Sequence, residues 1–133
     1  MANRCIEIHD SILAAVSFSQ GDARLHFSSV YIHQSECAPG RDAGSGWTQE
    51  AILRVYGARV DGSFLKFPVR LSDGSIQLGS QIFDNEIPVP LLHNGLITLR
   101  LIGAERGESV SFTGKGAELE LLGEPKYVEE FRP

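Results

Sequence analysis

The chain has few of the features that identify the larger classes of protein. It has only two cysteines, Cys5 and Cys37, which are too few for a disulfide scaffold and match no CxxC zinc or redox spacing. We expect both to be reduced thiols. The longest aliphatic run spans residues 12–16, whereas a membrane-spanning helix needs roughly 20 apolar residues. The sequence therefore predicts neither a disulfide-stabilised domain nor a membrane protein.

Basic clusters and a secretory signal are also missing. The 12 Lys and Arg are scattered along the chain and the net charge is −5, so nothing indicates a surface that could follow a phosphate backbone. Residues 1–10 carry charges where a signal peptide needs an apolar stretch. We expect a cytoplasmic, bacterial-type protein that binds no nucleic acid.

Sequence signatures of catalysis are absent as well. The chain contains no GxGxxG, Walker or GxSxG motif. His9, Asp10 and Ser11 have the residue types of a catalytic triad, but neighbours on an extended chain point in opposite directions and cannot form one. Because catalysis usually leaves a recognisable cluster, the sequence favours a protein with neither enzymatic activity nor a cofactor.

What the sequence does contain is alternation of apolar and polar residues. Leu99 and Leu101, for example, alternate with Thr98 and Arg100, which is typical of strands, because successive side chains point to opposite faces of a sheet. Similar segments recur with turn residues between them. We expect one all-β domain over residues 1–133, an antiparallel sandwich or flattened barrel of about 8 to 10 short strands with little or no helix.

Several local features follow from the same pattern. A strand over 64–71 is expected to end in a hairpin turn at 72–75, because Asp-Gly pairs favour tight turns. A break is expected at 10–11, a bulge at 28–29 where the apolar parity changes, and a bulge or turn at 114–116. The side chains expected in the core are Phe18, Phe27, Leu53, Phe67, Leu78, Leu99, Phe112 and Leu119.

A long polar loop is predicted over residues 34–46, followed by a strand over 47–56. Long loops in compact domains often carry function, and aromatic side chains beside polar ones suit a small-molecule or peptide site. The alternative is a flexible connection that Trp47 anchors to the core. The candidate ligand-binding residues are Tyr31, His33, Glu36, Arg41, Asp42 and Trp47.

Metal binding is weakly indicated. The four histidines, His9, His26, His33 and His93, do not have the two-residue spacing that places ligands on one face of a strand. Residues 84–86, Asp-Asn-Glu, offer oxygen ligands but are more typical of a turn. We expect no metal site.

The segment 123–133 follows the last clear strand yet retains three large apolar side chains, Tyr127, Val128 and Phe131. A disordered tail would have little use for them. We expect the segment to dock on its own domain, with docking on a second copy in a homodimer as the alternative. Pro125 is expected to end the strand pairing.

Four segments, 31–33, 46–47, 84–90 and 121–131, together resemble a family of small, uncharacterised bacterial all-β proteins. The resemblance implies no activity, cofactor or site residue. We therefore expect a non-catalytic binding or protein-interaction module with a small molecule, a protein or a second copy as its partner. The alternative is a small metal-dependent or carboxylate-based enzyme near the loop; its expected residues are His33, Glu36, Asp42 and Asp84.

Overall fold

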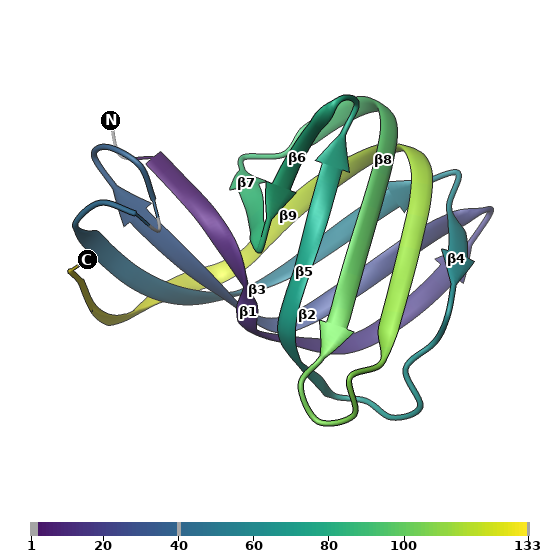
Figure 1. The fold of residues 1–133 in the computed structure, drawn as a ribbon, viewed down its shortest axis with the longest axis horizontal. Coiled ribbons are helices and arrows are strands. Elements are labelled where there is room, and N and C mark those ends of the chain that lie inside the picture. Colours follow the sequence, from purple (N-terminus) through teal and green to yellow (C-terminus); the bar gives the residue numbers. More distant parts are fainter. Residues whose placement is uncertain (1–2, 40, 133) are drawn as a thin grey trace.

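The computed structural model describes residues 3–39 and 41–132, and over these residues the chain is all-β, with antiparallel pairing and no helix (Figure 1). The predicted fold class is thereby confirmed. Accordingly, no helix of the described residues is long and apolar enough to cross a membrane. The strands are β1 (Asn3–Ser19), β2 (Asp22–Ser35), β3 (Gly44–Tyr56), β4 (Arg59–Asp61), β5 (Val69–Leu78), β6 (Gln81–Asp84), β7 (Glu86–Val89), β8 (Leu92–Gly103) and β9 (Ser109–Phe131).

The strands form one sheet that curls into a ring. Its order is β6-β5-β8-β9-β3-β2-β1-β7, and β4 pairs with β9. A short pairing of β1 with β5, Ile12 with Arg70 and Leu13 with Val69, closes the ring. The result is a flattened barrel of β1, β2, β3, β9, β8 and β5, seen at the right of Figure 1.

The longest strands continue past this ring and form what we call the arm, at the left of Figure 1. The arm consists of residues 3–9 of β1, 30–35 of β2, 44–49 of β3, 122–131 of β9, and the edge strand β7, which pairs with the start of β1. The position of β7 at the edge of the sheet agrees with its proline-rich sequence, since proline cannot donate a ladder hydrogen bond.

The core fills the ring and extends beneath one face of the arm. Of the predicted core, Phe27, Leu53, Leu99 and Phe112 are at most 2% exposed, whereas Leu78 and Leu119 are half-buried against the cluster. Two expectations are wrong, because Phe18 is 57% and Phe67 is 39% exposed. Phe18 lies beside the β1–β2 turn and Phe67 in the loop before β5, where no strand covers them.

The expected strand over 64–71 and turn over 72–75 are also wrong. Residues 62–68 lie outside the strands, and β5 runs without interruption from Val69 to Leu78. Gly74 belongs to this strand rather than to a turn, because a Cβ there would collide with the carbonyl oxygen of Arg100 and press on Ile8. The glycine therefore permits close packing, and the chain turns instead at residues 79–80.

The predicted irregularities of β1 and β2 are present. β1 bulges where Asp10 has a positive φ of 72°, and the register against β2 shifts between Glu7 and Ile12. A further shift on β2, between Phe27 and Val30, confirms the bulge at 28–29. These shifts reverse which side chains of β1 point inward. Simple alternation would bury Ile12, Ala14, Val16 and Phe18, but Leu13 is buried in their place.

The strand over 47–56 is confirmed as part of β3, but the long loop is shorter than expected. β2 continues to Ser35 and β3 begins at Gly44, so the connection comprises residues 36–43, of which Gly40 lies outside the described residues. The ends of the connection are hydrogen-bonded, since the Ser35 hydroxyl donates to the carbonyl oxygen of Ala43 at 2.9 Å. At 114–116, where a bulge or turn was expected, β9 runs without interruption. The register does shift there, but the extra residue lies on the partner strand β8, between Asn94 and Ile97.

The segment that follows Gly123 docks on its own chain as the last part of β9, as expected, although Pro133 lies outside the described residues. Pro125 does not end the pairing. Between the pairs Glu50–Leu122 and Thr48–Lys126, β9 has a bulge that accommodates the proline without a ladder hydrogen bond. Tyr127 and Val128 are about half exposed, at 53% and 46%, so their expected burial is wrong. The homodimer stays a prediction.

The different environments of two phenylalanines test this packing. Replacing the buried Phe112 with alanine should lower the free energy of unfolding by about 3 to 5 kcal/mol, because it leaves a cavity in the core. Phe18→Ala removes the same atoms from an exposed position and should cost less than about 1 kcal/mol. Urea unfolding curves of both variants measure the difference, and equal costs would contradict the core assignment.

Candidate functional site

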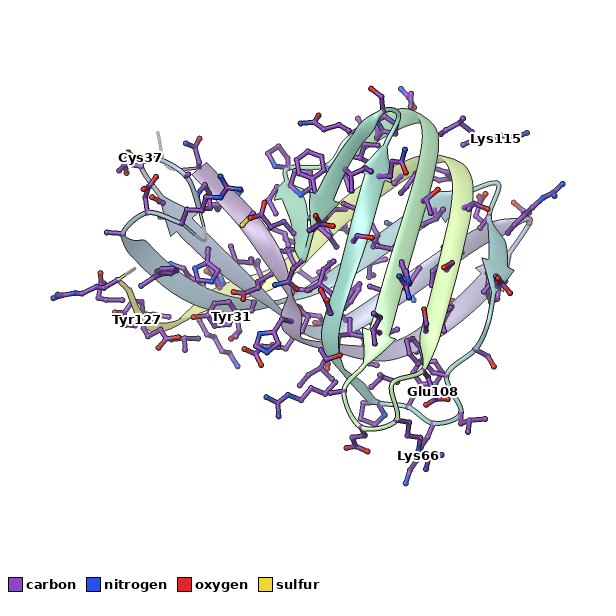
Figure 2. The ribbon with its side chains drawn as sticks, in the orientation of Figure 1. Tyr31, Cys37, Lys66, Glu108, Lys115 and Tyr127 are labelled. Atoms are coloured by element: carbon purple, nitrogen blue, oxygen red, sulfur yellow. The ribbon has the colours of Figure 1, made fainter. Side chains whose placement is uncertain are left out.

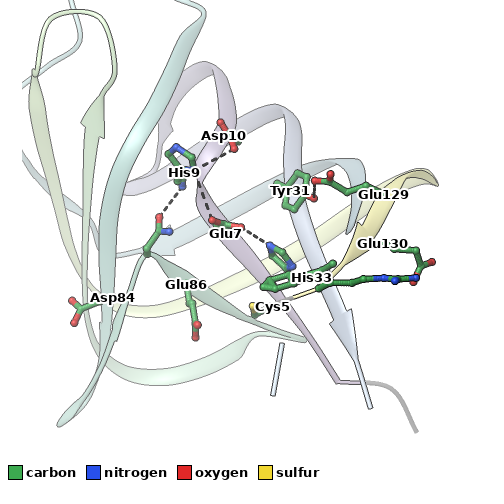
Figure 3. A pocket seen from close by; sticks show the side chains of 13 residues that line it. Cys5, Glu7, His9, Asp10, Tyr31, His33, Asp84, Glu86, Glu129 and Glu130 are labelled. Carbon is green, nitrogen blue, oxygen red and sulfur yellow. Dashed lines mark hydrogen bonds and ion pairs between the residues drawn. The ribbon is translucent and has the colours of Figure 1, made fainter. Parts of the chain in front are cut away.

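A cleft of about 500 Å³ lies on the outer face of the arm, where β1, β2, the turn between β6 and β7, and the end of β9 come together. Figure 3 shows Asp84 and Glu86 along one side, Glu7, His9 and Asp10 at the centre, and Tyr31, His33, Glu129 and Glu130 along the other. The volume is within the range of small-molecule sites. Titratable and aromatic side chains make up most of its lining.

The bulge of β1 turns three polar side chains toward the cleft. On a regular strand Glu7 and His9 would share one face and Asp10 would point to the other. The positive φ of Asp10 breaks this alternation. The bulge is held by the buried Ser11 hydroxyl, which donates to the carbonyl oxygen of Glu7 at 2.8 Å and accepts the N–H of Tyr31 at 3.2 Å.

His33 is the most buried of the polar side chains in the cleft, with 7% of its residue surface exposed. Its Nε2 shares a hydrogen bond of 2.5 Å with Oε2 of Glu7. The imidazole also lies between two aromatic rings, with centroid distances of 5.0 Å to Tyr31 and 4.7 Å to Phe131. These contacts hold the ring in one orientation.

Tyr31, on β2, reaches across the intervening strand β3 to contact β9. Its hydroxyl donates to Oε1 of Glu129 at 2.6 Å. This position requires glycine at 46, because a Cβ there would collide with the Tyr31 hydroxyl. Burial and the hydrogen bond to Glu129 raise the pKa of Tyr31 above its ordinary value, so the phenol keeps its proton and remains a donor.

The cleft is strongly acidic. Its cationic side chain is Arg132, and Asp10 is partly neutralised by Arg70 at 3.1 Å, which lies outside the cleft. The Nδ1 of His9 lies 3.2 Å from Oδ2 of Asp10 and 3.7 Å from Oε1 of Glu7. The carboxylates that line the cleft are Glu7, Asp10, Asp84, Glu86, Glu129 and Glu130.

Cys5 lies in the wall of the cleft and is 6% exposed. Burial raises the pKa of its thiol to about 12, and the negative charges of Glu86 and Glu7 add to the effect. The sulfur is therefore protonated at neutral pH and is a poor nucleophile, since the thiolate is the reactive form.

The structure brings together only part of the predicted site. Tyr31 and His33 line the cleft, but Glu36, Arg41 and Asp42 lie in the 36–43 connection and do not. There, Asp42 Oδ2 accepts the N–H of Ala38.

Trp47 is on the other face of the arm. It pairs with Ile32, whose side chain points away from those of Tyr31 and His33. Its Nε1–H donates to the Ser45 hydroxyl at 2.8 Å, and its ring meets Tyr127 edge-on at 5.3 Å. Trp47 is partly covered, as expected.

Glu7 and Glu129 were not anticipated from the sequence, and Glu86 was considered only as an oxygen ligand within the 84–86 turn. The one local signal is the two-residue spacing of Glu7 and His9 on a strand. Glu86 and Glu129 reach the same cleft only through the pairing of β7 with β1 and of β9 with β3. Long-range pairing of this kind has no local sequence signature.

The histidines do not converge on one point. His26 pairs with Glu50 at 2.6 Å, and His93 Nε2 lies 3.1 Å from the carbonyl oxygen of Leu96, both outside the cleft. Over the described residues, no group of three or more His, Cys, Asp or Glu side chains is arranged to hold a metal ion. The turn expected at 84–86 is present: Asn85, with a φ of 57°, links the end of β6 at Asp84 to the start of β7 at Glu86.

Comparison with known proteins adds no family. No protein-family model, curated protein or solved structure matches the chain. The resemblance to small bacterial all-β proteins stays a prediction, and the function must be argued from the cleft itself.

The two cysteines provide a test of the cleft's electrostatics. Cys37 is exposed at the tip of the arm (Figure 2), whereas Cys5 is buried beside Glu7 and Glu86. At pH 8 we expect an aromatic disulfide reagent to modify Cys37 at least about a hundredfold faster than Cys5, because little of the Cys5 thiol is ionised.

The Cys37→Ser and Cys5→Ser variants, each with one thiol, allow the two rates to be measured separately. The Cys5 rate should continue to rise with pH toward about 12. Equal rates at pH 8 would contradict the arrangement described.

Proposed function

We propose that this protein is a non-catalytic binding module and that the cleft on the arm is its ligand site. The observation that carries the proposal is the preassembled pair of contacts across the cleft, His33 with Glu7 at 2.5 Å and Tyr31 with Glu129 at 2.6 Å. They fix side chains from three strands in one geometry. Binding sites are usually preformed in this way, because groups already ordered lose little entropy when a ligand binds.

The state of the potential nucleophiles supports binding rather than catalysis. The Cys5 thiol has a pKa raised to about 12, so it remains protonated at neutral pH. The Ser11 hydroxyl is engaged by Glu7 and Tyr31 backbone groups. Neither is activated by a neighbouring base, which nucleophilic catalysis requires.

The carboxylate-based enzyme is a weaker candidate. An oriented His–Glu pair is suited to general base catalysis, and His33 and Asp84 both line the cleft. However, Glu36 and Asp42, the other residues expected to take part, lie in the 36–43 connection outside it.

A reducing compartment such as the cytoplasm is part of the proposal. Both cysteines are free thiols in the fold, one buried and one exposed. An exposed free thiol such as that of Cys37 is more typical of an intracellular protein than of a secreted one.

The proposal is tested by nuclear magnetic resonance of the ¹⁵N-labelled protein with a panel of small cationic, anionic and neutral compounds. We expect at least one compound to shift the amide resonances of Glu7, Tyr31, His33 and Glu129. His33→Ala should abolish the response, because it removes both the Glu7 partner and the ring between Tyr31 and Phe131.

The matched control is His26→Ala, which breaks a similar histidine–glutamate pair outside the cleft and should leave the response intact. The proposal fails if no compound shifts these amides, or if the response persists in His33→Ala.

A further inference from the structure

We infer that the ligand group bound in the cleft is an organic cation, a guanidinium or primary ammonium group carried on an aliphatic chain. This inference rests on the proposed function and names the class of its ligand. It is argued from the charge lining the cleft, from a buried thiol in its wall, and from the placement of its aromatic rings.

The charge of the cleft is unbalanced. Six carboxylates line it, and Arg132 is the cationic side chain opposite them. Arg70 compensates Asp10, but no ion pair with Lys or Arg is found for Glu7, Glu86 or Glu129 among the described residues. Carboxylates gathered in a concave site repel one another, and a bound cation would relieve that repulsion.

Cys5 is an independent indication that the cleft wall is built for an occupant. Its side chain is more than nine-tenths buried and faces the cleft between Glu86 and His33 (Figure 3). Within the described ranges 3–39 and 41–132 it forms no disulfide, and its sulfur takes part in none of the side-chain hydrogen bonds that cross the cleft. The small part of this protonated thiol that reaches the cleft is soft and uncharged, so the aliphatic part of a ligand can contact it without displacing a hydrogen bond.

The aromatic side chains favour the same class of ligand. Tyr31 and Phe131 flank His33, and Glu129 lines the same cleft. Cations are attracted to aromatic faces, and a guanidinium can contact a ring and a carboxylate together. The Tyr31 hydroxyl occupies Oε1 of Glu129, which leaves Oε2 as an acceptor for a ligand N–H.

The volume of the cleft indicates how large the ligand is. A space of about 500 Å³ is larger than a bare guanidinium or ammonium ion needs. The charged group therefore comes with a body, and an aliphatic chain fits the thiol and aromatic surfaces. A free amine or guanidine and an arginine or lysine side chain of a peptide share this chemistry.

The test is a set of isothermal titrations on the full chain at pH 7.5 and low salt. The probes are n-butylguanidinium and n-butylammonium, with butyrate and n-butanol as the anionic and neutral matches. We expect the two cations to bind, butyrate and butanol to bind at least about tenfold more weakly, and cation binding to weaken as salt is added.

Variants that are expected to change the Kd in opposite directions show whether binding takes place in the cleft. Glu7→Gln and Glu129→Gln should each raise the Kd for butylguanidinium about tenfold, because each removes a charge-assisted hydrogen bond. Arg132→Ala should lower the Kd, because it removes the opposing positive charge. Glu120→Gln makes the same chemical change in an ion pair with Arg54 outside the cleft and should have no effect.

A second experiment identifies the source of the cation. If the blocked peptide acetyl-Gly-Arg-Gly-amide binds at least tenfold more tightly than butylguanidinium, the natural ligand is a peptide side chain. If the two bind equally, it is a free small molecule. Both results support the cation.

The failures of the two proposals can be told apart. If butyrate or butanol binds in the titrations as tightly as the cations or more tightly, the cation inference is overturned and the binding cleft stands. If no probe binds, and no compound shifts the cleft amides in the resonance experiment, both are overturned. Circular dichroism and thermal melting of each variant verify that it is folded.

Discussion

The arm and its cleft depend on one buried hydroxyl. Ser11 is fully buried at the bulge of β1, where it bonds the carbonyl oxygen of Glu7 and the N–H of Tyr31. Glu7 and Tyr31 are the last pair of β1 and β2 before the register shifts, so the hydroxyl bonds both strands at the point where the bulge interrupts their pairing. It thereby supports the bulge that lets β1 serve two parts of the sheet.

The bulge gives each half of β1 a different task. After Ser11, Leu13 enters the core and pairs with β5, which closes the ring. Before Ser11, Ile6 and Ile8 remain in the core while Glu7 faces the cleft. The same strand thus stabilises the fold and presents the acidic group that orients His33. A regular strand would direct Asp10 away from the side that carries Glu7.

The sequence predicted the parts of the structure that depend on local alternation. The antiparallel fold class, the buried Phe27, Leu53, Leu99 and Phe112, and the bulge at 28–29 all follow from side-chain parity. The turn at 72–75 was wrong because Gly74 serves close packing between strands, a role that local sequence does not distinguish from a turn. Tyr31 and His33 were predicted because they precede the long polar loop and add aromatic and imidazole groups beside it. Their carboxylate partners Glu7 and Glu129 come from strands that only tertiary pairing brings near.

The most direct test of this account is the Ser11→Ala variant, assessed by its free energy of unfolding and its amide spectrum. Without the buried hydroxyl, the backbone groups of Glu7 and Tyr31 lose its hydrogen bonds, which should cost about 1 to 3 kcal/mol. The amides of Glu7, His9, Tyr31 and His33 should shift, while those of the core strands around Leu99 stay in place. Ser28→Ala, at an exposed position of the neighbouring bulge, is the control and should change little. A Ser11→Ala protein with unchanged stability and an unchanged spectrum would contradict the claim that this hydroxyl holds the arm and its cleft together.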